Sequence, residues 1–231
     1  MNPAAAAAGE LRREADVRRL EWAGHRPLPK AAYFMRENAK NERSTGPVEV
    51  TCTAEKDLIA ADEREIMQLQ RTAFPGASEF ETQRWYHAPP AEDDLWFGVR
   101  QDGRLIGSIR FIHRRINTSA GPFTVGGIGN VCSDPEARGT RAGLICMKAA
   151  QKYIASGGRV DFGLLFCGQG VRDYYKWLGW KVIDNQLVCA DADGNQIDTH
   201  AGENDFAMIY SGRRPIEDWP AGRIDLDGPD W

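Results

Sequence analysis

Residues 131–150 read VCSDPEARGTRAGLICMKAA, in which an apolar strand ends, a charged loop turns and an apolar helix begins. The first N–H groups of a helix have no partner within it and carry the positive end of its dipole, so they form a natural seat for phosphate. Gly139 and Gly143 would let a ligand approach the backbone, while Arg138 and Arg141 add positive charge. By itself, the stretch fits a phosphate cradle or a solvated charged turn equally well.

A second motif, DYYKWLGWKVI, spans residues 173–183. Tyr174 and Tyr175 both fit the packed face of an amphipathic helix. Adjacent helical residues point about 100° apart, so the two rings cannot share one role. One is expected to pack, and the other could present its hydroxyl to a site.

Together the two motifs form an ordered series: a strand, the loop, a helix, a buried strand, and a helix ending in YxxxGW. This order resembles the GNAT superfamily of N-acetyltransferases over about residues 48–210. In that family the loop reads roughly R-G-x-G-x-G/A and grips the pyrophosphate of coenzyme A, similar to RGTRAG here. A tyrosine in a Y-x-x-x-G-F/W setting acts as general acid, similar to YKWLGW. The resemblance implies an α+β fold, an α/β sandwich with a mixed, mostly antiparallel central sheet flanked by helices.

Within the superfamily, the chain looks most like the aminoglycoside 2'-N-acetyltransferases and more distantly like the nodulation N-acyltransferases. The first group also carries arginine in the loop and an arginine pair on the strand before the glycine-rich one, similar to IHRRI here. Its members end in an aspartate-containing tail that closes on tryptophan, much like DLDGPDW.

The resemblance implies that acetyl-CoA, or another acyl-CoA, is a co-substrate, and that no metal takes part. The pantetheine arm would pair, as an extra strand would, with the backbones of Val131, Cys132 and Ser133. The pyrophosphate would be held by the backbone amides of Arg138, Gly139, Thr140, Arg141, Ala142 and Gly143.

For catalysis, the resemblance implies that Tyr175 protonates the departing thiolate. Relatives often place a glutamate on the strand before the loop, as a base acting through water, and Gly129 stands at that position. The neighbouring Asn130 can at most orient the amine or a water by hydrogen bonding. Three readings stay open: the base lies elsewhere, the amine arrives neutral, or the activity is weak or absent.

The acceptor implied by the resemblance is a small cationic amine, attracted by Asp230 and the C-terminal carboxylate of Trp231. A solvated acidic tail explains Asp225, Asp227 and Asp230 equally well. Two other functions remain open: transfer of a longer acyl chain from acyl-CoA or acyl-carrier protein, and coenzyme A binding without catalysis. Family members are often dimers, so a homodimer is compatible with the resemblance.

The composition of the 231-residue chain is 42% hydrophobic and 27% charged, which is enough apolar material for a core. The net charge of -4 argues against a nucleic-acid partner. No stretch approaches the roughly 20 apolar residues of a membrane span, and MNPAAAAAGELRRE lacks the basic leader of a secretory signal. Five cysteines without a CxxC spacing and four scattered histidines indicate neither a disulfide framework nor a zinc site, and favour a reducing cytoplasm.

The organisation along the chain separates residues 1–47, expected to be a partly ordered N-terminal extension, from a compact domain at 48–231 that ends in an irregular acidic tail. The extension could also be an arm that packs on a partner subunit or covers the active site. Hydrophobic periodicity and turn residues predict helices over 62–74, 78–88, 142–156 and 169–179. Strands are predicted over 48–54, within 94–116 as a hairpin, and over 123–133, 160–168 and 205–211, with strand and turn over 180–198. Glycines inside the 123–133 strand indicate a bulge or a close approach to the backbone by another molecule.

Overall fold

The computed structural model describes residues 47–76, 91–156, 159–191, 193–199 and 205–231. The N-terminal extension and the helix predicted over 78–88 therefore lie outside the described residues. The other predicted helices and strands are confirmed. None of the helices within these ranges is long and apolar enough to cross a membrane.

The first half of the sheet is built from antiparallel neighbours in chain order. Its strands are β1 (Val48–Ala54), β2 (Leu95–Gln101), β3 (Arg104–Thr118) and β4 (Gly121–Ser133). The predicted QDGR hairpin joins β2 to β3 through Asp102 and Gly103, whose φ angles are 52° and 79°. Two central residues with positive φ are what a type I′ turn requires, and Asp-Gly supplies them at little cost.

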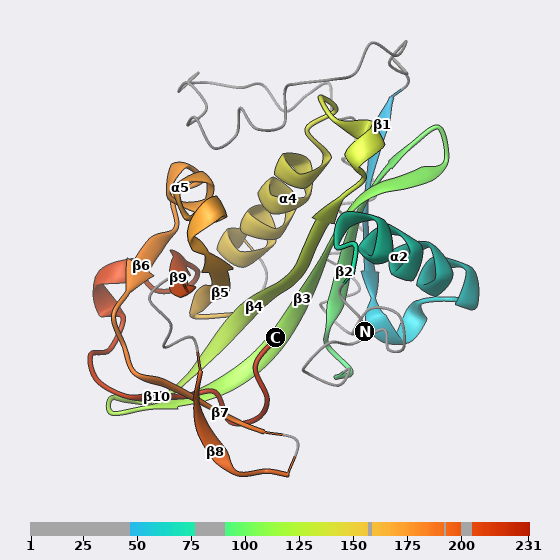
Figure 1. Cartoon of the computed structure of the whole chain (residues 1–231). Coiled ribbons are helices and arrows are strands. Elements are labelled where there is room, and N and C mark those ends of the chain that lie inside the picture. The colour runs from blue at the N-terminus through green and yellow to red at the C-terminus, as the bar shows by residue number, and fades with distance from the viewer. Residues whose placement is uncertain (1–46, 77–90, 157–158, 192, 200–204) are drawn as a thin grey trace.

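The second half of the sheet begins with a crossover. The helix α4 (Ala142–Ser156) leads from β4 to β5 (Phe162–Gly168), which runs parallel to β4. The remaining elements are α2 (Ala60–Ala73), α5 (Gln169–Trp177), β6 (Lys181–Ile183), β7 (Leu187–Ala190), β8 (Gln196–Thr199), β9 (Asp205–Ser211) and β10 (Ile224–Asp225). The strand order is β6-β9-β5-β4-β3-β10-β7-β8, with β2 and then β1 added beside β3. The fold is thus the mixed, mostly antiparallel α+β sandwich expected from the sequence (Figure 1).

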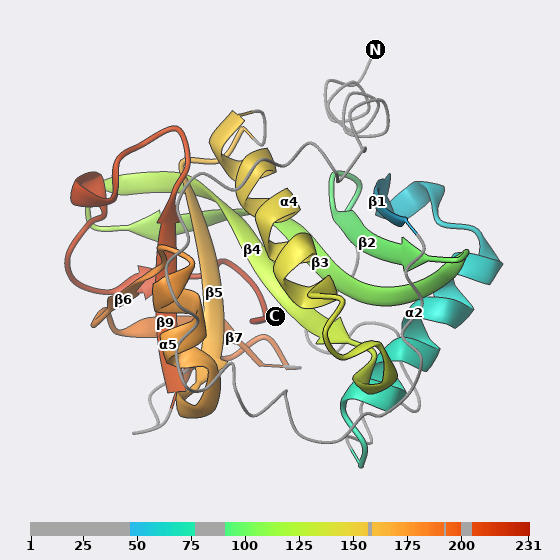
Figure 2. The same cartoon turned by 90° about the horizontal axis from the view of Figure 1, so that it is seen from above.

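Side-chain alternation along the strands assigns the two faces of this sheet. Phe97 and Phe111 pack in the core under α4, together with Tyr153 of that helix. Trp96, one residue before Phe97, joins a separate cluster with Leu69 of α2. Successive strand residues point to opposite faces, so α4 and α2 cover opposite sides of the sheet (Figure 2).

The C-terminal tail contains more regular structure than the sequence predicted. Its strand β10 pairs with β3 on one side and with β7 on the other. Ile224 and Leu226 are fully buried, and the chain then turns back to end against the middle of β3 and β4 (Figure 1). A two-residue strand is too short to show an alternating pattern. Its conformation is set by distant partners, which local sequence cannot reveal.

Candidate active site

The central feature of the site is a fork between the two parallel strands. β4 and β5 pair only from Val125–Phe162 to Ile128–Leu165. β4 then continues to Ser133 with no strand of the described chain on its β5 side. An unpaired strand edge offers N–H and C=O groups to which an extended ligand can add, as another strand would.

A β-bulge in β4 marks the point where the strands part. Two residues of β4, Asn130 and Val131, oppose the single Ile109 of β3. Asn130 has a φ of 52°, a left-handed conformation that asparagine tolerates better than most residues. Because a bulge bends its strand, the β4 backbone turns away from β5 here. The predicted bulge is therefore present, and the half-buried Asn130 makes no side-chain hydrogen bond with any described residue.

The loop between β4 and α4 presents unpartnered backbone amides. Within the described chain, no hydrogen bond is donated by the amides of Arg138, Gly139, Gly143 and Leu144. Gly139 and Arg141 take positive φ angles of 94° and 64°, and such left-handed residues turn neighbouring N–H groups toward one concavity. Added to the free amides at the start of α4, this makes an anion-binding cradle.

Local contacts hold the cradle in shape. The Thr140 hydroxyl donates to the Ala137 carbonyl at 2.7 Å and accepts from the Ala142 amide at 3.3 Å. A Cβ atom on Gly107 of β3 would lie only 3.0 Å from Ala142 Cβ, so the start of α4 is packed tightly onto the sheet. The side chains of Arg138 and Arg141 are exposed beside this loop. Arg141 thus contributes backbone geometry and a surface charge, and its presence is compatible with a cradle.

The YxxxGW motif closes α5 and fixes Tyr175. Gly179, with a φ of 96°, donates its amide to the Lys176 carbonyl at 3.0 Å, and the Trp180 amide reaches the Tyr175 carbonyl at 3.1 Å. This pair of bonds is a Schellman motif, which requires a left-handed residue where Gly179 stands. Trp180 and Tyr175 both pack in the core beneath α4. The motif therefore sets where the helix stops and which way Tyr175 points.

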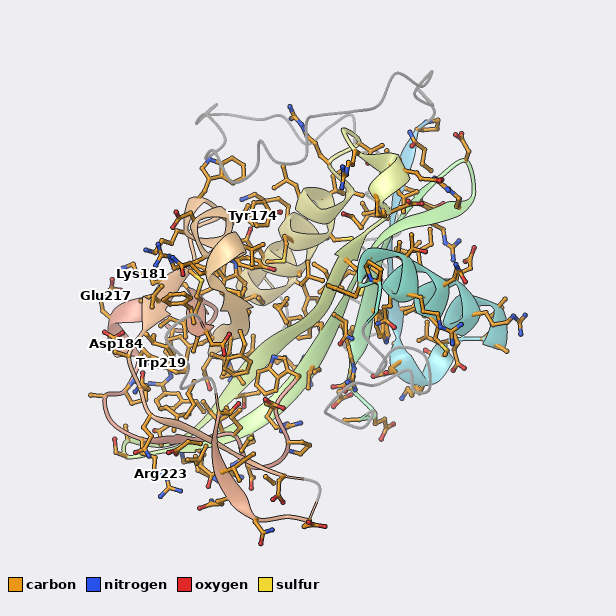
Figure 3. The ribbon with its side chains drawn as sticks, viewed as in Figure 1. Tyr174, Lys181, Asp184, Glu217, Trp219 and Arg223 are labelled. Carbon is orange, nitrogen blue, oxygen red and sulfur yellow. The ribbon has the colours of Figure 1, made fainter. Side chains whose placement is uncertain are left out.

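The two tyrosines of α5 lie in different surroundings. Tyr174 projects toward α4, is half-buried and stacks on Trp177 at 6.4 Å (Figure 3). Tyr175 is buried, and its hydroxyl makes no hydrogen bond with any described residue. Burial raises the pKa of Tyr175 well above its usual range. The pKa is raised further by the adjacent Tyr174 and then by Cys167, which lies on the part of β5 beyond the fork. Tyr175 accordingly keeps its proton and lies beside the end of β5 that no longer pairs with β4.

A family model described as an acetyltransferase (GNAT) domain matches residues 56–183, more than half of the chain. The chain belongs to the GNAT acetyltransferase family. The fork, the amide cradle and the buried tyrosine lie within or beside the matched region, and membership identifies the protein as an N-acyltransferase. No curated protein gave a significant match.

Solved GNAT structures share the architecture at low sequence identity. ElaA from Escherichia coli is 12% identical, with a TM-score of 0.52 over 71% of this chain and 99% of its own. YhbS from Escherichia coli, solved in complex with CoA, is 14% identical, with a TM-score of 0.51 over 80% of this chain and 93% of its own. An acyl-CoA N-acyltransferase from Pseudomonas aeruginosa is 18% identical, with a TM-score of 0.50 over 71% and 99%. At these identities the likeness concerns the fold.

The face of the GNAT sheet opposite α4 holds the end of the tail at the fork. The Trp231 ring lies on β4 so closely that a Cβ atom on Gly127 would come within 2.5 Å of it, and one on Gly129 within 3.4 Å. The same ring packs against Phe166, the first β5 residue beyond the fork, at 5.2 Å between centroids. The close approach that the glycines indicated is therefore made by the protein's own ring.

Two of the predicted acidic residues of the tail, Asp225 and Asp230, have hydrogen-bond partners within the protein. Asp230 accepts a hydrogen bond of 2.9 Å from the Thr199 hydroxyl on β8. Asp225 accepts from Gln196 at 2.6 Å and from the Asp227 amide at 2.9 Å. The bond to Asp230 anchors the end of the tail near the fork, whereas Asp225 is held at the far end of β3, in register with Asn117.

A buried ion cluster next to the fork was not predicted from the sequence. Arg110, paired in register with Gly129, contacts Asp94 at 3.1 Å and Glu55 at 3.4 Å, and all three side chains are at most 1% exposed. Trp96 also donates to Glu55, at 3.2 Å. An arginine in an otherwise apolar strand was the one available signal. The cluster ties three distant segments together and brings charge close to the position where relatives carry a glutamate.

The cysteines near the fork are poor nucleophiles. Burial raises the pKa of the Cys132 and Cys167 thiols to about 11 each, so both stay protonated at neutral pH. Cys132 lies 3.5 Å from the Ser108 hydroxyl, and Cys167 contacts Met208 at 3.6 Å. Among the residues that the structure describes, no group of three or more acids, histidines or cysteines is placed to hold a metal ion.

Proposed function

We propose that this GNAT protein transfers an acetyl group from acetyl-CoA to a primary amine of a small cationic acceptor, similar to an aminoglycoside. One observation carries the proposal: the free edge of β4 runs from the amide cradle at the start of α4 to the fork, beside Tyr175. This arrangement gives one extended ligand a phosphate site at one end and a proton donor at the other.

Coenzyme A would be held by backbone groups along this route. The amides of the loop from Arg138 to Gly143 would bind the pyrophosphate, with the exposed Arg138 and Arg141 adding positive charge. The backbones of Val131, Cys132 and Ser133 would pair with the pantetheine arm. These strand residues have no partner on their β5 side within the described chain, so the fit requires no displaced hydrogen bond.

In the proposed reaction, the acceptor amine attacks the thioester carbonyl carbon. A backbone N–H of the glycine-rich strand stabilises the oxyanion that forms. The carbon–sulfur bond then breaks, and Tyr175 gives its proton to the departing sulfur. The attacking nitrogen, which carries one extra proton after bond formation, releases it to water, and a proton from water restores the Tyr175 hydroxyl. Because residue 129 is a glycine, the amine must arrive neutral or lose its proton to a group other than residue 129, and Asn130 can orient the amine or a water.

The cationic acceptor is supported by the tail. Asp225, Asp227 and Asp230 lie within six residues of one another, and hydrogen bonds hold Asp225 and Asp230 in position. Asp230 directly precedes Trp231, whose ring lies at the fork. A polycationic amine would gain favourable electrostatic contact there. Asp230 and Trp231 are the residues assigned to the acceptor.

The test combines binding with product detection. Calorimetry with CoA and acetyl-CoA measures cofactor binding, and mass spectrometry of reactions with a panel of aminoglycosides and other amines identifies any acetylated product. We expect micromolar acetyl-CoA binding and a mass gain of one acetyl group on a cationic amine. Tight acetyl-CoA binding with no product across the panel would instead identify a non-catalytic coenzyme A-binding module.

A further inference from the structure

We propose that the indole of Trp231 limits the length of the acyl chain at the fork, and that Arg114 is the positioning residue that holds it there. The inference rests on the proposed function, because it assumes that the thioester of a bound acyl-CoA reaches the fork. It predicts that this protein uses short acyl donors and gives a structural reason for that preference.

The route of the bound arm leads to this indole. An extended arm that starts at the amide cradle and pairs with the free edge of β4 runs from Ser133 back toward Gly129. At about 3.3 Å per residue, this edge is roughly 13 Å long. In the plane of the sheet the arm must stop where Ile128 pairs with Leu165. A group at its end can then extend only out of the plane of the sheet.

Each face of the sheet is closed by packed side chains at this point. On the α4 side, Ile128, Leu165 and Tyr175 belong to one buried core cluster. On the other side, the Trp231 ring covers Gly127 and Gly129 and packs on Phe166. The indole nitrogen is buried there without a hydrogen-bond partner, so no hydrogen bond from the indole fixes the ring. Acetyl is short enough to end at the fork, whereas each further methylene of the acyl chain would extend into the space that the indole fills.

Arg114 of β3 contacts the indole once and the backbone of the tail before it twice. Its guanidinium lies 5.4 Å from the centre of the Trp231 ring, within the range of a cation–π interaction. The same group donates to the Pro229 carbonyl at 2.8 Å and to the Leu226 carbonyl at 3.3 Å. The side chain of the next residue, Arg115, is exposed and makes no hydrogen bond, ion pair or ring contact with any described residue, so Arg115 is a matched control.

The experiment measures the Kd of CoA, acetyl-CoA and hexanoyl-CoA by calorimetry for the wild-type protein and for Trp231→Ala, Trp231→Phe, Arg114→Ala and Arg115→Ala. Hexanoyl carries four more methylenes than acetyl, and each one that becomes buried strengthens binding about fourfold. We expect the wild-type protein to prefer acetyl-CoA. In Trp231→Ala, hexanoyl-CoA should gain at least about tenfold relative to acetyl-CoA. Arg114→Ala should shift the ratio of the two Kd values, hexanoyl-CoA to acetyl-CoA, in the same direction. The ratio for Trp231→Phe should lie between those of the wild type and Trp231→Ala, and the ratio for Arg115→Ala should equal that of the wild type.

Free CoA serves as the internal reference, because it carries no acyl group. Its Kd should agree within about twofold across all the proteins. If Trp231→Ala and Trp231→Phe keep the wild-type ratio of hexanoyl-CoA to acetyl-CoA while binding CoA normally, the acyl limit is wrong and the proposed function stands. If the wild-type protein binds neither CoA nor acetyl-CoA, the proposed function itself is overturned.

Discussion

Replacement of Tyr175 by phenylalanine removes one hydroxyl group and tests the proton donor directly. That hydroxyl makes no hydrogen bond with any described residue, so its loss leaves no protein group without a partner. The free energy of unfolding should therefore change by less than about 1 kcal/mol. General acid catalysis contributes about 10²–10⁴-fold, so kcat should fall at least about tenfold, which corresponds to about 1.4 kcal/mol or more in the transition state.

The assay is steady-state acetyl transfer to the best acceptor of the amine panel, with the Kd of acetyl-CoA measured in parallel. We expect a lower kcat and an unchanged Kd. Burial holds the pKa of Tyr175 above its usual range, so the hydroxyl is neutral at every pH of the assay. The ratio of the wild-type kcat to the kcat of Tyr175→Phe should therefore be the same at pH 7 and pH 9.

Tyr174→Phe is the matched control, because it deletes the same atom from the neighbouring residue of the same helix. Burial raises the pKa of Tyr174 as well, so the two tyrosines do not differ in protonation at neutral pH. Tyr174→Phe should keep the wild-type kcat. An unchanged kcat in Tyr175→Phe, or equal losses in the two variants, would refute the assignment of Tyr175 as the proton donor.

Three further outcomes follow from the geometry. Arg110→Leu leaves the fully buried Asp94 without its cation, so the free energy of unfolding should fall by about 3–5 kcal/mol. In thermal unfolding, the Tm should fall by roughly 10 °C, and an unchanged Tm would contradict a structural role for Arg110. Cys132 and Cys167, with pKa values of about 11, should resist iodoacetamide at pH 7.5, as judged by peptide mass spectrometry of the native protein; rapid labelling would contradict their burial. Asp230→Asn keeps an acceptor for the Thr199 hydroxyl but removes the negative charge of the side chain. The KM for a cationic amine should therefore rise severalfold while the Kd of acetyl-CoA stays constant, and an unchanged KM would show that Asp230 does not bind the acceptor.

The parts of the fold that were predictable from sequence are those set by local chemistry. Asp102 and Gly103 specify the hairpin turn, and the helix predicted over 142–156 has those bounds in the structure. Gly179 specifies the end of α5, since only a residue that accepts a positive φ closes a helix in this way. Each of these signals lies within a few residues of the element that it determines.

The parts that sequence did not reveal depend on segments far apart along the chain. The ion cluster joins Glu55, Asp94 and Arg110, from the residue after β1, the residue before β2 and the middle of β3. The Trp231 ring, which covers the fork, brings the end of the tail into contact with β3, β4 and β5. A single sequence carries no record of which distant side chains meet, so the tail could be predicted only as acidic and irregular.

The tail also narrows the space at position 129, where relatives carry a glutamate. A Cβ atom at Gly129 would lie 3.4 Å from the Trp231 ring and 3.6 Å from the Trp231 carbonyl carbon, which is ordinary van der Waals contact. A longer side chain at this position would therefore have to point away from the ring. At Gly127, by contrast, a Cβ atom would come within 2.5 Å of the ring, so the tail requires a glycine there. In the proposed reaction, the proton of the amine is therefore handled by a group other than residue 129, and Asn130 of β4 can orient the amine or a water.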